Sequence, residues 1–195
     1  MALGLWLRDV SLPSRTRHGD RAPRRLLKDR RGSTAVEFGL VALPFLVMLF
    51  AIVESTLVFF NTLTLENGMT QVARLIRTGQ VQAQGMSESQ FRQVLCDEIK
   101  MLMSCNENLI IDVRKFQDFG DANSPSPTDG NGNITIQPQF NPGKDGEIIM
   151  VRMYYKYHIQ TPVMEKYLSN AAGGVRLLAT AAVFRNEPFG EILSN

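Results

Sequence analysis

The feature that most constrains this chain is an apolar run near its N-terminus. From Phe38 to Phe60 there are 23 residues, of which only Glu54 carries an ionisable side chain. As a helix, such a run can cross a hydrocarbon core of about 30 Å. It is longer than the apolar region of a secretory signal, roughly 7 to 15 residues, and no small-residue cleavage site closes it. We therefore expect a transmembrane helix over residues 33–60.

Charge is distributed unevenly about this run. The residues up to Arg31 carry nine basic and three acidic side chains, whereas the remaining 164 residues carry twelve basic and sixteen acidic ones. A short basic flank beside a span stays in the cytoplasm. A basic arm can also bind nucleic acid, but this arm adjoins a span and lacks interleaved aromatic residues, so we favour the membrane interpretation and expect no nucleic-acid partner. The predicted protein crosses the inner membrane once, contacts lipid and places residues 61–195 outside the cytoplasm.

The pattern after the span predicts helices. Apolar residues continue at helical spacing, so the membrane helix extends outward: Leu65, Met69, Val72 and Ile76. Gly79 is placed as its C-terminal cap. Ser87 and Gln90 then form a capping box ahead of a second, amphipathic helix.

Beyond residue 108 the apolar period changes to two, which is typical of half-buried strands. Residues 109–114 and 149–159 alternate in this way, with Asp112, Arg114 and Arg152 among the polar positions. Residues 175–183 are compatible with a strand or, because of their alanines, with a helix. The fold class is therefore α+β: a long N-terminal transmembrane helix, an amphipathic helix and a small antiparallel sheet, with a long loop over residues 117–146 as a binding or variable surface.

The two cysteines, Cys96 and Cys105, lie in the part expected on the oxidising side, where a disulfide is permitted. Nine residues along an unbroken helix rise about 13.5 Å. A disulfide tolerates a Cα separation of roughly 4.4 to 6.8 Å. The bond therefore requires the helix to end before Cys105. The alternative is two buried free thiols, but export and the turn-rich composition of residues 104–108 favour the bond.

Sequence motifs give no support for an enzyme, a metal site or a cofactor. Residues 129–133 resemble the start of a calcium loop, but Ile134 stands where the loop needs glycine and Phe140 where it needs a bidentate glutamate. His18 lies in the leader, and His158 lies on the polar face of a predicted strand with no His or Cys nearby. Neither a nucleophile elbow nor a nucleotide-binding glycine motif occurs.

Two glutamates stand out in the apolar region. A carboxylate well inside a span costs on the order of 2.5 to 3.5 kcal/mol, so we expect Glu54 either to make an intramembrane helix-to-helix contact or to extend toward the membrane surface. Glu37 lies in the first turn of the helix, where the helix dipole alone favours an acid.

A family resemblance gives Glu37 a second interpretation. Gly32-Ser33-Thr34-Ala35-Val36-Glu37-Phe38, after two arginines and before an apolar run, resembles the processing site of Tad and Flp prepilins. The chain is most similar to the TadE-like pseudopilins in these segments: Arg30-Arg31-Gly32, Ala35-Val36-Glu37-Phe38, Pro44, Ile52-Val53-Glu54 and Asn186-Glu187-Pro188.

The resemblance implies a pilin-like minor subunit that works in Tad (Flp) pilus assembly and secretion. A prepilin peptidase would cut between Gly32 and Ser33, which makes residues 1–32 a cleaved leader and the protein a substrate. Glu37 and Phe38 would complete the processing and assembly motif. Expected partners are the peptidase, other pilin subunits and Tad inner-membrane assembly components, with incorporation into a pilus as one destination. The alternative is an uncleaved bitopic anchor or sensor with a ligand-binding periplasmic domain.

Overall fold

The computed structural model describes residues 32–105, 107–122 and 125–190. The predicted leader therefore lies outside the described residues, apart from Gly32. The chain divides into two units, residues 1–44 and 45–195. Helix α2, Ser33–Arg77, begins in the first unit and supplies the longest element of the second. The remaining description of the fold concerns the second unit.

Two further helices follow α2, and local sequence signals set their ends. Gly79 adopts φ 77°, a left-handed conformation that favours glycine, and it separates α2 from the short helix α3, Gln80–Ala83. Helix α4, Glu88–Ile99, begins with the predicted capping box. The Ser87 side chain accepts a hydrogen bond from the Gln90 backbone, and the Gln90 side chain accepts one from the Ser87 backbone. Both signals are confirmed.

The sheet contains three antiparallel strands in the order β1-β2-β3: Leu109–Phe116, Ile148–His158 and Val175–Arg185. Register pairs Asp112 with Arg152 and Tyr155 with Leu178. The run after residue 175, for which the sequence left two options, is a strand. The predicted α+β class is thus confirmed.

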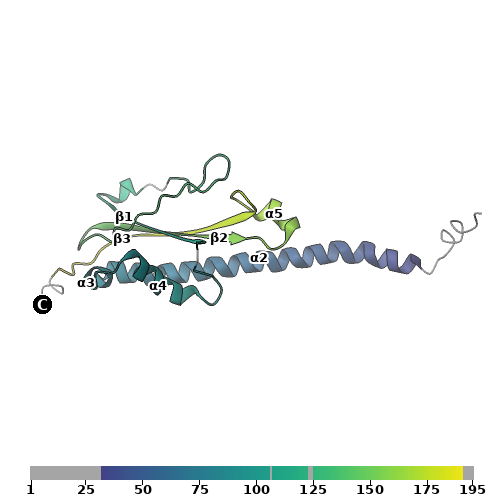
Figure 1. The fold of residues 1–195 in the computed structure, drawn as a ribbon, viewed down its shortest axis with the longest axis horizontal. Coiled ribbons are helices and arrows are strands. Elements are labelled where there is room, and N and C mark those ends of the chain that lie inside the picture. The colour runs from purple at the N-terminus through teal and green to yellow at the C-terminus, as the bar shows by residue number, and fades with distance from the viewer. Residues whose placement is uncertain (1–31, 106, 123–124, 191–195) are drawn as a thin grey trace, which may run out of the picture. The chain divides into compact units, whose positions relative to one another are not determined.

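The core lies between one face of this sheet and the helices α2 and α4, as Figure 1 shows. Its most deeply buried side chains alternate along the strands and recur at helical spacing along α2 and α4: Leu65, Val72, Ile76, Phe91, Leu95, Ile99, Ile111, Val113, Ile149, Val151 and Met153. Each such side chain stabilises the fold by about 1.5–3 kcal/mol. Gly68 lets the two helices approach, because a Cβ there would lie 2.8 Å from Leu95 and Ile99.

The other face of the sheet is also covered over β1 and β2, which corrects the prediction that these two strands are half-buried. Asp112, Arg152 and Tyr154 are at most 4% exposed although the alternating pattern assigned them to the solvent face. The connection between β1 and β2 folds across this face (Figure 1). Its backbone pairs with the free edge of β1, where Val113 donates to Gln139 and accepts from Asn141. The long loop is therefore a third layer of the domain.

Helix α5, Pro162–Leu168, connects β2 to β3 and was not expected from the sequence. Thr161 precedes it as the N-cap residue, and Pro162 occupies the first turn. Proline suits this position because its missing N–H would have no partner within the helix.

Candidate functional site

The candidate site is the exposed apolar part of α2 together with the polar groups at its two ends. Twelve large apolar side chains between residues 36 and 53 are exposed by 43% or more: Val36, Phe38, Leu40, Val41, Leu43, Phe45, Leu46, Met48, Leu49, Phe50, Ile52 and Val53. Among the described residues, α2 is the one helix long and apolar enough to cross a membrane, and its most apolar window is wholly unburied. This part of α2 is compatible with single-pass membrane anchoring.

The predicted processing residues lie at the start of α2 and just before it. The Ser33 hydroxyl donates a hydrogen bond to a Glu37 carboxylate oxygen at 3.0 Å. Gly32 is exposed, and nothing lies within 4 Å of the position that a Cβ would take. Phe38 is 75% exposed. These residues belong to the first unit and form an accessible helix start.

Glu54 lies where the exposed part of α2 meets the folded domain, and its side chain is only 2% exposed. Its carboxylate accepts four hydrogen bonds from the end of β2 and the connection to α5. One oxygen accepts from the Tyr157 hydroxyl at 2.9 Å and the Gln160 amide at 3.2 Å. The other accepts from the Thr161 amide at 3.1 Å and the Thr161 hydroxyl at 2.8 Å. The donors of one short segment therefore enclose the carboxylate.

Burial and the nearby carboxylate raise the pKa of Tyr157 to about 12. The phenol therefore keeps its proton and remains a hydrogen-bond donor throughout the physiological pH range. From the sequence we expected Glu54 to make a helix-to-helix contact or to extend toward the membrane surface. In the structure it instead accepts hydrogen bonds from Tyr157, Gln160 and Thr161 of the same chain. Tyr157, Gln160 and Thr161 were missed as site residues; the Thr161-Pro162 helix-start pattern was the one local signal that could have drawn attention to this segment.

Replacing Glu54 with leucine is expected to release this connection without weakening the apolar character of α2. Four donors lose their acceptor, and hydrogen bonds to charged groups are worth about 1.5–3 kcal/mol each. Hydrogen exchange at the Gln160 and Thr161 amides should accelerate by roughly tenfold to a hundredfold, since 1.4 kcal/mol is a factor of ten. The measurement is amide exchange of the full chain in detergent.

Glu66→Leu is the matched control, because Glu66 is an exposed glutamate of the same helix. It should leave exchange at Gln160 and Thr161 unchanged. Unaltered protection of these two amides in Glu54→Leu would contradict the assigned role of the carboxylate.

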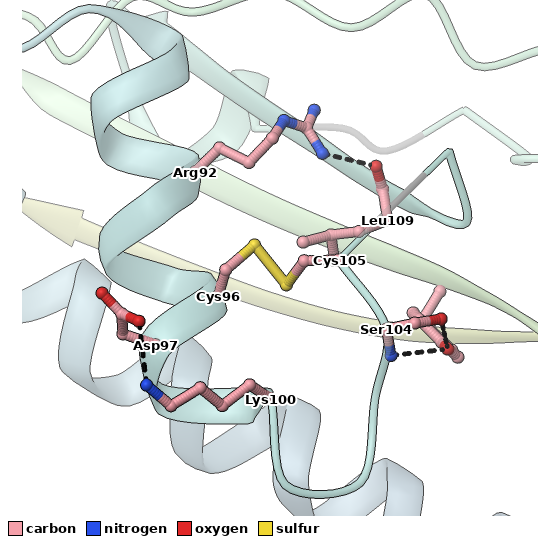
Figure 2. The surroundings of a disulfide bond; sticks show 8 residues. Arg92, Cys96, Asp97, Lys100, Ser104, Cys105 and Leu109 are labelled. Carbon is pink, nitrogen blue, oxygen red and sulfur yellow. Dashed lines mark hydrogen bonds and ion pairs between the residues drawn. A yellow bond between two sulfur atoms is a disulfide. The ribbon is translucent and has the colours of Figure 1, made fainter.

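Cys96 and Cys105 form a disulfide (Figure 2). Helix α4 ends at Ile99 and the chain reverses, which brings the two Cα atoms to 5.6 Å. The bond closes a loop with a sequence separation of 9, which is worth about 2–3 kcal/mol in the loop-entropy account. Arg92 of α4 also donates a hydrogen bond to the carbonyl of Leu109, the first residue of β1, at 2.7 Å. The start of β1 is therefore held against α4.

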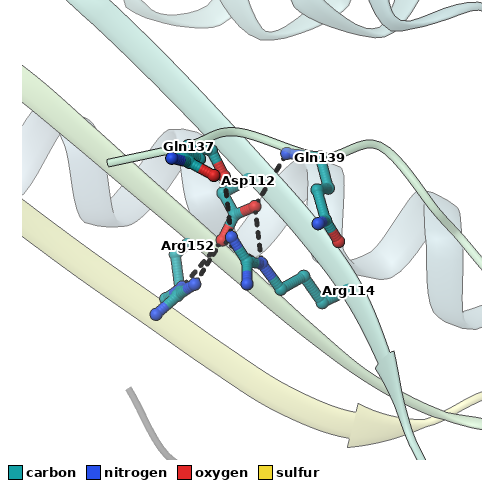
Figure 3. Close-up of polar contacts among 5 residues, drawn as sticks. All are labelled: Asp112, Arg114, Gln137, Gln139 and Arg152. Carbon is teal, nitrogen blue, oxygen red and sulfur yellow. Dashed lines mark hydrogen bonds and ion pairs between the residues drawn. The ribbon is translucent and has the colours of Figure 1, made fainter. Parts of the chain in front are cut away.

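A buried ion cluster holds the long loop on the outer face of the sheet (Figure 3). Asp112 accepts hydrogen bonds from the Arg152 Nε at 2.9 Å and from the Arg114 Nε at 2.9 and 3.0 Å. It also accepts the Gln139 amide at 2.8 Å, while Arg114 donates to the Gln137 carbonyl at 2.7 Å. One carboxylate thus joins two strands and the loop.

Within the described ranges, no group of three or more His, Cys, Asp or Glu side chains is arranged to hold a metal ion.

Residues 32–74 match the family model described as TadE-like protein. The N-terminal helix is TadE-like. The resemblance expected from the sequence is thereby confirmed over the part of α2 that begins at the exposed apolar run and ends in the domain core. Neither a curated protein nor a solved structure matches the chain. The TadE-like segment includes Gly32 and the two glutamates Glu37 and Glu54.

Proposed function

We propose that this chain is a membrane-anchored structural subunit, a minor pilin or pseudopilin that serves Tad (Flp) pilus assembly and secretion without enzymatic activity. The observation that carries the proposal is the match of residues 32–74 to the TadE-like family. The TadE-like family suggests involvement in Tad pilus assembly. The unburied apolar side chains within the matched segment support anchoring by this helix.

In this proposal the membrane segment is residues 33–53, shorter than the 33–60 expected from hydropathy. Glu54 is enclosed by donors of the folded domain, and a folded domain does not fit within the hydrocarbon core. A helix of 21 residues is about 31 Å long at 1.5 Å per residue, close to a hydrocarbon thickness of about 30 Å. Glu54 then lies at the non-cytoplasmic end of the span, so its charge is outside the hydrocarbon core.

The orientation places the leader in the cytoplasm and the domain outside. The excess of basic residues before Gly32 supports this direction. The disulfide between Cys96 and Cys105 supports it independently, because disulfides persist in oxidising compartments.

The N-terminus is the proposed processing site. A prepilin peptidase cuts between Gly32 and Ser33 on the cytoplasmic side, and the new amino group of Ser33 lies one helical turn from Glu37. An amine and a carboxylate paired in this way can set the register of neighbouring subunits, since either charge left alone in a membrane is costly. The partners are then the peptidase, other pilin subunits and Tad inner-membrane components.

Fractionation of expressing cells tests anchoring and orientation. We expect the protein to stay in the membrane pellet after alkaline carbonate extraction. External protease should degrade residues beyond 54 in spheroplasts and leave a short membrane-protected fragment. Release by carbonate would contradict anchoring, and a domain protected until the spheroplasts are lysed would contradict the orientation.

A further inference from the structure

Helix α5 has large apolar or aromatic side chains that the rest of the domain leaves exposed. Among its seven residues, PVMEKYL, no side chain is buried. Val163 and Tyr167 are 53% and 72% exposed, and their spacing of four residues places them on one helical face. An apolar face of this kind needs a covering surface.

The position of α5 indicates what that surface is. Thr161, the residue before the helix, is hydrogen-bonded to Glu54 through both its amide and its hydroxyl. Helix α5 therefore starts beside Glu54, where the domain meets the exposed apolar part of α2, at the same end of the sheet as His158 and Val175 (Figure 1). Val53 and Leu57, on either side of Glu54 along α2, are 48% and 41% exposed and continue the apolar surface.

We propose that α5 lies in the headgroup region of the bilayer, on the non-cytoplasmic side of the membrane that residues 33–53 cross. Helix α5 would then be the part of the domain that contacts this membrane. The inference relies on the proposed anchoring by residues 33–53. Tyrosine is enriched at membrane interfaces, and the Lys166 stem can lie along apolar surface while its ammonium group reaches phosphate.

The neighbouring charges are compatible with a lipid surface. Glu165 is exposed, and its carboxyl group lies against Gly174, where a Cβ would be 2.5 Å from the carboxyl carbon. Arg176 donates to the Leu168 carbonyl at 3.1 Å and so satisfies the C-terminal end of α5. Lys166 is the basic residue of α5 and is exposed, so its ammonium group can reach anionic headgroups.

Tryptophan fluorescence in brominated lipid tests the depth of α5. The full chain carries one tryptophan, Trp6, so Trp6→Phe gives a silent background. Tyr167→Trp in liposomes of phosphatidylcholine and phosphatidylglycerol, brominated near the carbonyl end of the acyl chains, should lose at least about half its emission relative to unbrominated lipid, because interfacial helices lie about 5–10 Å deep.

Two further variants separate this inference from the anchoring on which it depends. Phe119→Trp replaces a side chain that is 54% exposed beyond β1, at the opposite end of the sheet from α5, and should show no quenching. Phe50→Trp, in the proposed span, should be quenched by lipid brominated deeper in the chains. Quenching of Phe50→Trp with none in Tyr167→Trp would overturn the α5 proposal alone, including the case in which a second protein covers α5. Absence of quenching at Phe50 would overturn the anchoring itself.

Discussion

Gly32→Leu is expected to abolish N-terminal processing, so that only the full-length species accumulates when a prepilin peptidase is co-expressed. Glycine allows the backbone to enter a narrow active site without a side chain, and leucine would block that approach at the scissile bond. The structure offers no folding reason for such a loss, because the Cβ position at Gly32 has nothing within 4 Å. Gel mobility beside the wild-type chain gives the result.

Gly39→Leu is the matched control. Gly39 lies seven residues farther along the same exposed helix and likewise has open space at its Cβ position. It receives the same substitution, increases the apolar character of the span and should be processed as the wild type is. Shortening of Gly32→Leu to the wild-type mobility would contradict cleavage after Gly32.

Asp112→Ala is expected to destabilise the domain by about 3–5 kcal/mol, because it removes the carboxylate that pairs with the buried Arg152 guanidinium. The Arg152 side chain is 5% exposed and that of Asp112 is fully buried. The loop should loosen as well, since the Gln139 amide loses its acceptor. Urea denaturation of the full chain in detergent, followed by far-UV circular dichroism, measures the loss.

An exposed ion pair provides the comparison. Asp97 contacts Lys100 at 3.1 Å, with side chains 65% and 72% exposed. Asp97→Ala should change the free energy of unfolding by less than about 1 kcal/mol, since exposed pairs contribute little. Equal effects of the two substitutions would show that the Asp112 cluster does not hold the loop.

Local sequence patterns predicted much of the helical part of the fold. The capping box at Ser87 and the left-handed glycine at Gly79 depend on neighbours within a few residues, so both could be identified without the structure. The apolar repeat after Leu65 similarly located the face of α2 that enters the core. These signals are short-range by nature.

The polar contacts that complete the domain could not be predicted in this way. Glu54 and its donors are separated by 103 to 107 positions, and no local pattern indicates that pairing. The alternation around Asp112 and Arg152 predicts exposed polar residues, because period-two patterns do not reveal a distant segment that folds over the second face. Arg152 is buried because the loop over residues 117–146 covers it. The composition of that loop suggested only a binding or variable surface.

Sequencing the N-terminus of the membrane-extracted protein tests the central claim most directly. The account predicts a mature chain that begins Ser33-Thr34-Ala35, with Glu37 one turn from the new amino group. A chain that still begins at Met1 in cells containing a prepilin peptidase would contradict it. That outcome would favour the uncleaved bitopic anchor or sensor.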